Sequence, residues 1–261
     1  MIAYGAAIAS DEKFERYAKR GIDLVSGPET KLIYRRGRKC LFSAYNEIMD
    51  EAVEDPRIEA LVLIHEDTEI RDPRFEEKLR WGLDDPDVAI VGTIGATGVQ
   101  GIDWWVHESG IGSSILEPID AAELYETPLL KGSEMSGTGG FGDVDMVDGY
   151  LLGMSRWALK ELRFDELEVG PGFHGYDADI CFQARERGRK VFVAEMSVAH
   201  HRNSISPTPY RSDWLRAQIA FRRKWERRGM LKAPKLPFPP YVKTKQERDE
   251  ARQRLRLQAL D

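Results

Sequence analysis

Short apolar runs alternate with helix-periodic segments along most of the chain. The clearest run covers 60–64, is flanked by charged residues and ends abruptly in His65, Glu66 and Asp67. A short run bounded in this way is typical of a strand buried on both faces of a parallel sheet. Similar runs predict further strands at 2–9, 31–35, 88–94, 143–154 and 190–193.

Helices are predicted between these strands because apolar side chains recur there at intervals of three or four residues. Ala44, Ile48 and Ala52 share one face of such a helix. Gly21 is expected to end the first helix, since glycine is common just after a helix C-terminus. We place helices at 12–20, 43–54, 156–162, 176–187, 210–228 and 244–257, and one after Asp72-Pro73.

Strands that alternate with helices predict an α/β fold, with a mostly parallel, Rossmann-like central sheet and helices on both faces. In such open sheets, ligands bind just beyond the carboxyl ends of the strands. The glycine-rich nucleotide motifs GxGxxG and GxxxxGKS/T are absent from the chain. Acidic residues and a metal would therefore have to take over their task if a nucleotide binds here.

The alternating pattern stops between 95 and 142, a stretch rich in Gly, Ser and Thr. An irregular segment of this length inside a compact domain is typical of a functional loop or of a partly disordered segment. Its Trp104 and Trp105 fit either a stacking platform for a sugar or a local hydrophobic plug. We divide the chain into a domain at 1–205 and a helical, proline-containing C-terminal extension at 206–261.

Composition and net charge limit the kinds of partner and the cellular compartment that the protein is expected to have. Of the 261 residues, 42% are hydrophobic, which is enough for a sizeable core, and the net charge of −6 gives no general attraction to nucleic acids or acidic membranes. Cys40 and Cys181 form no CxxC motif and favour a reducing compartment. No apolar run approaches the roughly 18 residues of a membrane span. We therefore expect a cytoplasmic protein.

Three groups of polar residues lie at predicted strand ends or helix starts: 65–67, Asp148-Gly149, and 174–179 with His200-His201 shortly after it. Each has a simpler explanation when taken alone. Acids at a helix N-terminus favour the helix dipole, adjacent histidines are not by themselves a metal motif, and Asp148 fits a turn in which glycine permits a positive φ.

The order and spacing of these groups resemble the GT-A glycosyltransferases, specifically the family 2-like enzymes that use nucleotide sugars. The resemblance covers about 1–205 and rests on the segments 43–46, 65–67, 148–149, 177–179 and 198–200. Its most specific part is 173–200, which combines an acid pair, a helix, a strand and a histidine. The resemblance implies a GT-A catalytic domain in which 95–142 forms the acceptor-side loop.

The resemblance also implies a metal-dependent, inverting sugar transfer. Asp177 would be the general base, and Asp67 and His200 would bind Mn²⁺ or Mg²⁺ against the donor diphosphate, with His201 as the alternative ligand. Glu66 would bind the donor or share the metal. The remaining donor- and acceptor-binding residues would be Ala9, Ser10, Asn46, Asp148, Gly149, Asp179 and Trp104, and Asp179 would also support the start of the helix that carries Asp177.

Two residues depart from the family pattern: His65 replaces the first acid of the Asp-x-Asp-type motif, and Tyr176 precedes Asp177 where an acid is frequent. The expected donor is a nucleoside-diphosphate sugar, with a UDP-sugar as the leading candidate. The acceptor stays open among a glycan, a protein, a lipid-linked molecule or another hydroxyl compound.

Two other functions stay open at this point. A nucleotidyltransferase of similar topology would need a glycine-rich, basic loop after the first strand, where this chain has Ser10-Asp11-Glu12. A non-catalytic binding or assembly module is kept open by His65. The C-terminal extension is a candidate surface for self-association, and its basic run 222–228 is expected to be the solvated face of a helix more often than a site for an anionic partner.

Overall fold

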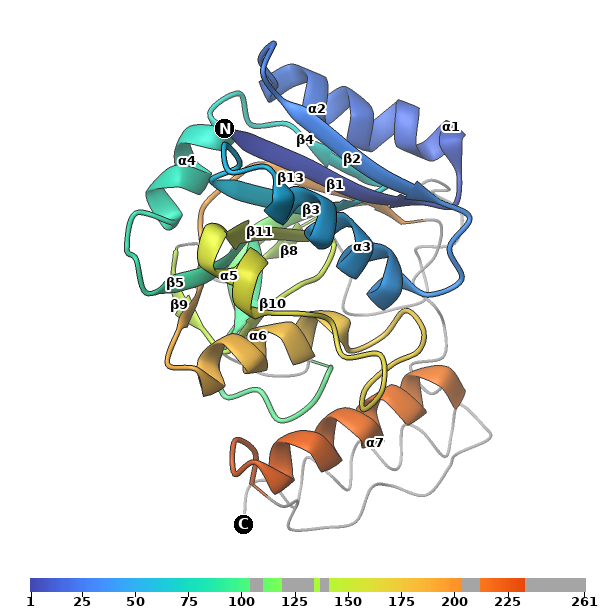
Figure 1. Cartoon of the computed structure of the whole chain (residues 1–261), viewed down its shortest axis with the longest axis vertical. Helices are drawn as coiled ribbons and strands as arrows, with labels where there is room; N and C mark the ends of the chain where they lie inside the picture. The colour runs from blue at the N-terminus through green and yellow to red at the C-terminus, as the bar shows by residue number, and fades with distance from the viewer. Residues whose placement is uncertain (104–109, 119–133, 137–140, 203–211, 233–261) are drawn as a thin grey trace.

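The computed structural model describes residues 1–103, 110–118, 134–136, 141–202 and 212–232. A seven-stranded sheet forms its centre (Figure 1). In spatial order it consists of β2 (Lys31–Arg36), β1 (Ile2–Ile8), β3 (Ala60–His65), β11 (Leu151–Ser155), β5 (Val88–Gly92), β12 (Lys190–Val193) and β9 (Gly142–Val144).

Most strands of this sheet run in one direction. β1 pairs in parallel with β2 and β3, and β12 pairs in parallel with β5. β11 is antiparallel to both β3 and β5, and β9 is antiparallel to β12. The run 60–64 is fully buried, as expected for a strand covered on both faces. The predicted α/β fold with a mostly parallel central sheet is confirmed.

Helices cover both faces of the sheet. Tyr4 and Gly5 are consecutive in β1, so the side-chain positions of the two residues lie on opposite faces of the sheet. The Tyr4 hydroxyl donates to Glu76 in α4 (Phe75–Gly82), whereas Gly5 faces Ile48 in α3 (Leu41–Glu54). The other helices are α1 (Asp11–Lys13), a π-helical turn (Phe14–Lys19), α2 (Arg20–Val25), α5 (Arg156–Glu161), α6 (Tyr176–Glu186) and α7 (Ser212–Arg227).

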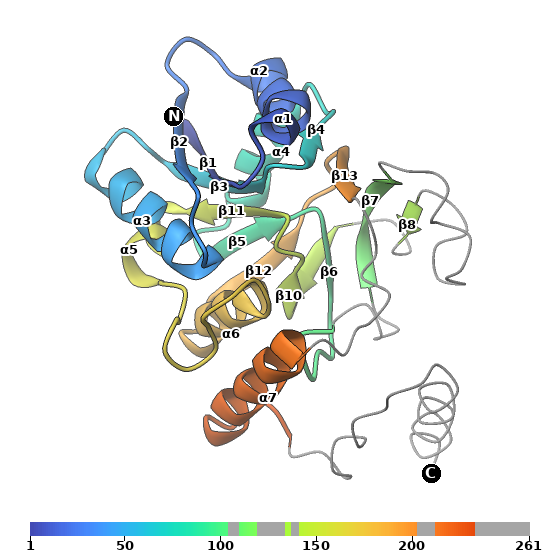
Figure 2. The ribbon, with the colours of Figure 1, turned by 90° about the vertical axis from the view of Figure 1, so that its right-hand side faces the viewer.

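A second sheet lies beside the first (Figure 2). Its order is β10 (Met146–Val147), β6 (Ile94–Ala96), β7 (Gly110–Pro118), β13 (Val198–Arg202) and β4 (Thr68–Ile70), with β8 (Glu134–Ser136) paired to β7. One expectation is corrected by this sheet, because part of the predicted loop 95–142 is regular strand. His200 and His201 lie within strand β13.

Two other local predictions were wrong. The helical stretch continues through Gly21 to Val25, and Gly21 serves close packing instead of ending the helix, since a Cβ atom there would lie 2.3 Å from the backbone nitrogen of Ile70. The single strand predicted at 143–154 is divided into β9, β10 and β11, with a turn at Asp148-Gly149 before β11. In both places a close tertiary contact or a turn overrides the apolar pattern of the sequence.

The described part of the C-terminal extension packs into the same hydrophobic core as the rest of the chain. Phe221 and Trp225 of α7 are fully buried, and their rings contact Phe182 of α6. The division at 205 therefore does not separate two hydrophobic cores among the described residues. The helix predicted at 244–257 lies outside them.

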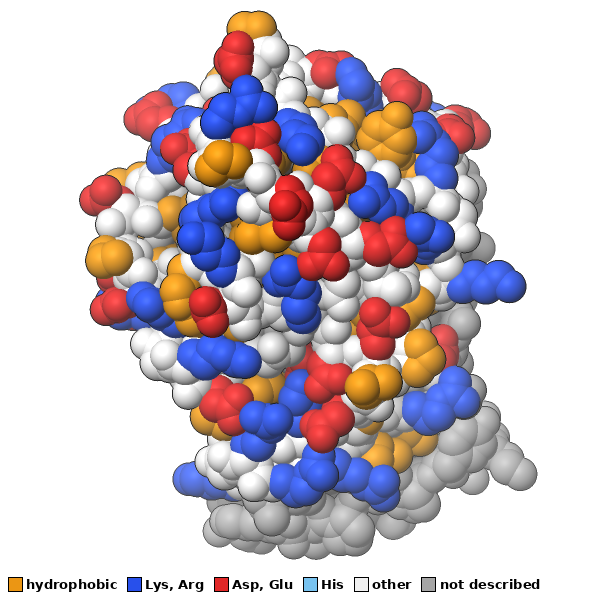
Figure 3. All heavy atoms as spheres, viewed as in Figure 1, with side chains coloured by type: hydrophobic (Ala, Val, Ile, Leu, Met, Phe, Trp, Pro, Cys, Tyr) orange, Lys and Arg blue, Asp and Glu red, His pale blue; other side chains and the backbone are white. Residues whose placement is uncertain are grey.

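The surface mixes charges of both signs. The face viewed in Figure 3 carries Lys and Arg side chains interspersed with Asp and Glu side chains. Among the described residues, no helix combines the length and the apolar character that crossing a membrane requires.

Candidate active site

His65 is the last residue of β3, and the turn from β3 to β4 carries Glu66 and Asp67 at the carboxyl end of this central strand. β13 runs antiparallel to β4, so His200 comes to lie beside this turn. The Asp67 Oδ1 atom is 3.2 Å from His200 Nε2. The two residues predicted as metal ligands are thus neighbours, although 133 positions separate them in the chain.

Strand geometry distinguishes His200 from His201. Successive side chains of a strand point to opposite faces, and the His201 side chain lies on the other face of β13. There its Nε2 atom is 3.0 Å from Glu69 Oε2, and its ring stacks on Tyr17 with centroids 3.9 Å apart. Its backbone N–H donates to the Asp67 carbonyl. His201 supports the turn, whereas His200 faces Asp67.

His65 completes a cluster with these two residues. Ligand atoms of His65, Asp67 and His200 all lie within 4.8 Å of one another. We call this group the His–Asp–His cluster. His65 Nε2 is 2.7 Å from the hydroxyl of Tyr176. The two residues that depart from the family pattern are therefore hydrogen-bonded to each other.

Positive groups surround the Asp67 carboxylate. Burial by itself would raise the pKa of Asp67, but the hydrogen bond from His200 and the charges of His200, His65 and Lys13 hold this pKa below its ordinary value. Lys13 Nζ, in the first helical turn after β1, lies 3.7 Å from Asp67 Oδ2. Asp67 is therefore ionised and available to a cation at neutral pH.

Glu66 has a different environment. Its Oε2 atom accepts hydrogen bonds from the backbone N–H groups of Ala9, at 2.5 Å, and Ser10, at 2.8 Å. Ser10 is also the N-cap of α1, where its hydroxyl accepts from the Lys13 N–H. Glu66 thus joins the end of β1 to the turn that carries Asp67.

Asp177 lies in the first turn of α6, beside the turn before β11. Its carboxylate accepts hydrogen bonds from the N–H groups of Gly149 and Ala178. Burial and then the negative charge of Asp148 raise the pKa of Asp177 to about 7, against the opposing effect of these N–H groups. A carboxylate with this pKa can accept a proton near neutral pH.

Gly149 is required by the packing around Tyr176. A Cβ atom at position 149 would lie 2.2 Å from the Tyr176 hydroxyl oxygen. Because Tyr176 precedes Asp177 and also bonds His65, this contact links the Asp177 site to the His–Asp–His cluster. The structure therefore brings together Asp67, His200, Asp148, Gly149 and Asp177, with Ala9 and Ser10 held at the edge by Glu66.

Asp179 lies outside this group. Its side chain is fully buried, and its oxygens accept hydrogen bonds from Gln183, Lys224 and Trp225 at 2.8–2.9 Å. Lys224 also bonds Asp165. The expectation that Asp179 binds donor or acceptor is corrected, because its carboxylate joins α6 to α7. Lys224 is likewise buried, contrary to the solvated face predicted for the basic run.

Asn46 is also occupied by the fold. Its amide donates to the Phe164 carbonyl at 2.9 Å and accepts from the Phe164 N–H at 2.8 Å. These bonds hold the segment before α6 against α3, and the expected position of Asn46 beside a nucleoside stays a prediction. Trp104 falls outside the described residues.

Tyr45 is a residue that the sequence did not single out. Within the part of the chain that the structure describes, its hydroxyl is buried and has no hydrogen-bond partner. Burial raises the pKa of Tyr45 well above its usual range, and the charges of Asp67, Asp177 and Glu66 raise it further. These three carboxylates therefore act on one buried phenol.

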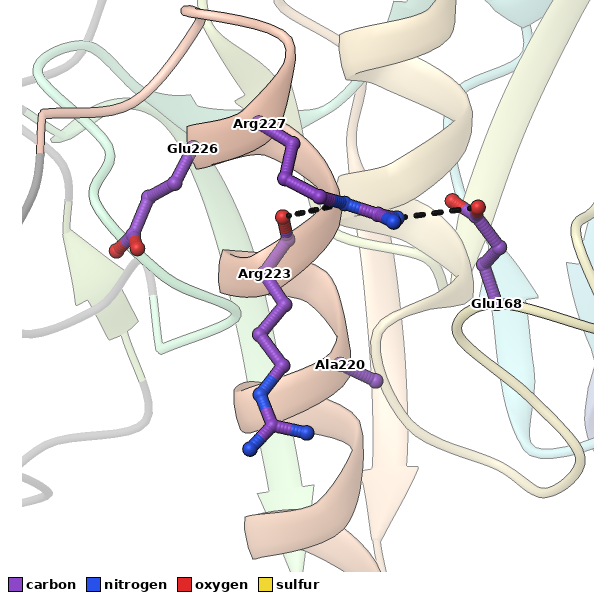
Figure 4. Close-up of a pocket in the computed structure, with 5 residues that line it drawn as sticks. All are labelled: Glu168, Ala220, Arg223, Glu226 and Arg227. Atoms are coloured by element: carbon purple, nitrogen blue, oxygen red, sulfur yellow. Dashed lines mark hydrogen bonds and ion pairs between the residues drawn. The ribbon is translucent and has the colours of Figure 1, made fainter.

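A separate surface depression of about 370 Å³ lies on α7 (Figure 4). It is lined by Glu168, Ala220, Arg223, Glu226 and Arg227. Arg227 spans it to Glu168 with an N–O distance of 3.1 Å. None of its lining residues belongs to the His–Asp–His cluster or to the Asp177 site, so the depression is not part of the candidate active site.

The chain matches a known protein family over most of its length. A family model described as "Glycosyltransferase like family" matches residues 7–214. The chain is 27% identical over 225 residues to the streptomycin biosynthesis protein StrF of Streptomyces griseus, covering 86% of this chain and 75% of that protein.

Among solved structures, the chain resembles the mannosyltransferase PcManGT from Pyrobaculum calidifontis in complex with GDP-Man and Mn²⁺. The TM-score is 0.50 at 11% identity, over 89% of this chain and 65% of that protein. A likeness at this level of identity concerns the fold alone, and the present chain spans just under two thirds of the mannosyltransferase.

Proposed function

The chain belongs to the glycosyltransferase-like family, and from that premise we propose that it transfers a sugar from a nucleoside-diphosphate sugar to an acceptor hydroxyl, with a metal ion and with inversion. The observation that carries the proposal is the proximity of Asp67, His200 and Asp177 at one edge of the sheet. One part of this edge suits a cation, and the other suits a proton acceptor.

The residues fit a divalent metal by their chemistry. Asp67 offers a carboxylate and His200 an imidazole, a pair that suits Mn²⁺ better than Mg²⁺ because imidazole is a poor ligand for magnesium. Among the described residues, the Tyr45 hydroxyl is buried and has no hydrogen-bond partner, and it is a further polar group near the carboxylates of Asp67, Asp177 and Glu66. The metal would stabilise the negative charge that develops on the departing diphosphate. The mannosyltransferase solved with GDP-Man and Mn²⁺ supports the same choice.

Asp177 is the proposed general base. It would accept the proton of the acceptor hydroxyl while the acceptor oxygen forms a bond to the anomeric carbon. The bond between that carbon and the diphosphate breaks, and its electron pair leaves with the diphosphate. Attack from the face opposite the leaving group inverts the configuration. The pKa of about 7 suits this role, because a substantial share of the carboxylate is ionised at neutral pH and the ionised group is basic enough to take a proton.

Other residues would position the donor. Ala9 and Ser10 lie at the end of β1, where Glu66 fixes their backbone. Lys13 provides a positive charge beside Asp67, and this charge would favour the binding of a diphosphate. Asp148 and Gly149 form the turn next to Asp177 and would contact the sugar or the acceptor. The acceptor side would involve 95–142 and the C-terminal extension.

The two alternatives make different predictions. A nucleotidyltransferase is disfavoured because α1 begins with Ser10, Asp11 and Glu12 rather than with a glycine-rich basic loop. A non-catalytic module would bind the donor without consuming it. Slow, metal-dependent hydrolysis of a nucleotide sugar would distinguish the enzyme from such a module.

A thermal-shift screen tests the proposal. UDP-, GDP- and TDP-sugars would each be added with and without Mn²⁺. We expect one nucleotide to raise the melting temperature only when Mn²⁺ is present, because a ligand that binds the native state stabilises it. No shift with any of these donors plus Mn²⁺ would contradict the proposal.

A further inference from the structure

His65 and Tyr176 form a pair to which the proposed mechanism gives no role. Each stands where the family pattern has an acid, and the two are joined by a 2.7 Å hydrogen bond between His65 Nε2 and the Tyr176 hydroxyl. The bond crosses from the end of β3 to the start of α6. Two residues that both depart from the family pattern and contact each other suggest one joint function rather than two independent replacements of an acid.

Tyr176 is held firmly. It is almost fully buried, and its ring packs against Phe42, Tyr45 and Phe164 with centroids 5.8–6.1 Å apart. The Gly149 backbone closes in on its hydroxyl, where even a methyl group would not fit. The hydroxyl therefore has a fixed position, and its hydrogen bond fixes the orientation of the partly exposed His65 ring.

The His65 ring is directed to the proposed metal site. It lies edge-on to the His200 ring at a centroid distance of 5.6 Å. Ligand atoms of His65, Asp67 and His200 lie within 4.8 Å of one another. Ligands bound about 2.1 Å from one ion lie about 3 to 4 Å apart, so small side-chain rotations suffice to bring all three to a single ion.

We propose that His65 is a third protein ligand of the metal, with Tyr176 as its positioning residue, and that the resulting two-histidine, one-carboxylate set selects Mn²⁺ and later transition-metal ions over Mg²⁺. The inference rests on the proposed function, because it concerns the metal that Asp67 and His200 would bind.

General coordination chemistry supports this selectivity. Imidazole suits transition metals, whereas Mg²⁺ favours oxygen ligands and keeps its water shell. In metal sites, a ligating histidine commonly hydrogen-bonds an oxygen atom through its second ring nitrogen, which orients the ring and makes it a better ligand. The Tyr176 hydroxyl supplies such an oxygen for His65.

Pulsed EPR of Mn²⁺ bound to the full chain tests the inference, because it detects coordinated nitrogen and needs no catalytic turnover. We expect the signal of two imidazole nitrogens in the wild-type protein and of one in His65→Asn. Mn²⁺ affinity should fall at least about tenfold in His65→Asn and less in Tyr176→Phe, while Mg²⁺ affinity should change less than Mn²⁺ affinity in both. His65→Asp should narrow the preference for Mn²⁺ over Mg²⁺.

His201→Gln is the matched control, since it removes the adjacent imidazole from the opposite face of β13. Its nitrogen signal should equal that of the wild-type protein. One imidazole nitrogen in the wild-type protein and an unchanged signal in His65→Asn would overturn the inference and leave the proposed function intact. Failure of the wild-type protein to bind Mn²⁺ with or without a nucleotide would overturn both. Circular dichroism would establish that each variant is folded.

Discussion

Asp177 and Asp179 are two residues apart in the first turn of α6, yet their environments are opposite. Asp177 is partly exposed, faces Asp148 and has a raised pKa. Asp179 is fully buried and accepts hydrogen bonds from three side chains, two of which come from α7. A separation of two residues rotates the side-chain direction by about 200° around a helix. One carboxylate therefore points to the site and the other to the core.

The comparison shows that two acids close together in a sequence motif, such as Asp177 and Asp179, can have side chains in different environments. Asp177 suits the proposed role of base, because within the described part of the chain its carboxylate accepts hydrogen bonds from backbone N–H groups and not from a cationic side chain. Asp179 cannot take this role without losing the contacts that join α6 to α7. Substitutions at or beside each carboxylate should distinguish the proposed base from the residue that joins α6 to α7.

The largest effect is expected from Asp177→Asn. The amide cannot accept a proton, so transfer should fall by about 10² to 10⁴, the usual contribution of a general base. Binding of the donor with Mn²⁺ should be kept, because the metal ligands are unchanged. Initial rates and donor titrations would measure both. Normal turnover would rule out Asp177 as the base.

Lys224→Met should act on stability rather than on chemistry. It leaves the buried Asp179 carboxylate without its cation, and breaking a buried ion pair in this way costs about 3 to 5 kcal/mol. Chemical denaturation would measure the loss. Arg227→Met on the same helix removes only an exposed pair with Glu168 and should have little effect. Equal stability of the two variants would contradict the structural role of Asp179.

The pH dependence gives a smaller but sharper test. Only ionised Asp177 accepts a proton, so the transfer rate should fall as pH drops below about 7. Asp148→Asn removes a negative neighbour that disfavours ionisation. The pKa of Asp177 should then decrease and the acid limb should move to lower pH, measured at saturating Mn²⁺ in both proteins. An acid limb that stays in place would show that Asp148 does not influence the base.

The sequence predicted the overall fold well, because buried strands such as 60–64 and amphipathic helices such as 43–54 have strong local patterns. The resemblance gave Asp177 and Asp179 different roles, but the sequence could not show that Asp179 is buried, since its burial depends on where Lys224 and Trp225 pack.

Pairings across the second sheet were equally hidden from the sequence. His200 and His201 are adjacent residues, and only the register of β13 against β4 decides which of them faces Asp67. The contact between His65 and Tyr176 spans 111 positions and leaves no local signal. Asn46 was assigned by resemblance to a binding role, but its amide is used by the backbone of Phe164.

The central claim is that Asp67 holds a metal ion through which the donor diphosphate binds. Calorimetric titration of the nucleoside diphosphate identified by the thermal-shift screen tests it most directly, in the wild-type protein and in Asp67→Asn, each with and without Mn²⁺. We expect binding to the wild-type protein to require Mn²⁺, and we expect Asp67→Asn to lose this dependence together with most of the affinity. Equal binding by the two proteins, or binding that ignores Mn²⁺, would contradict the account.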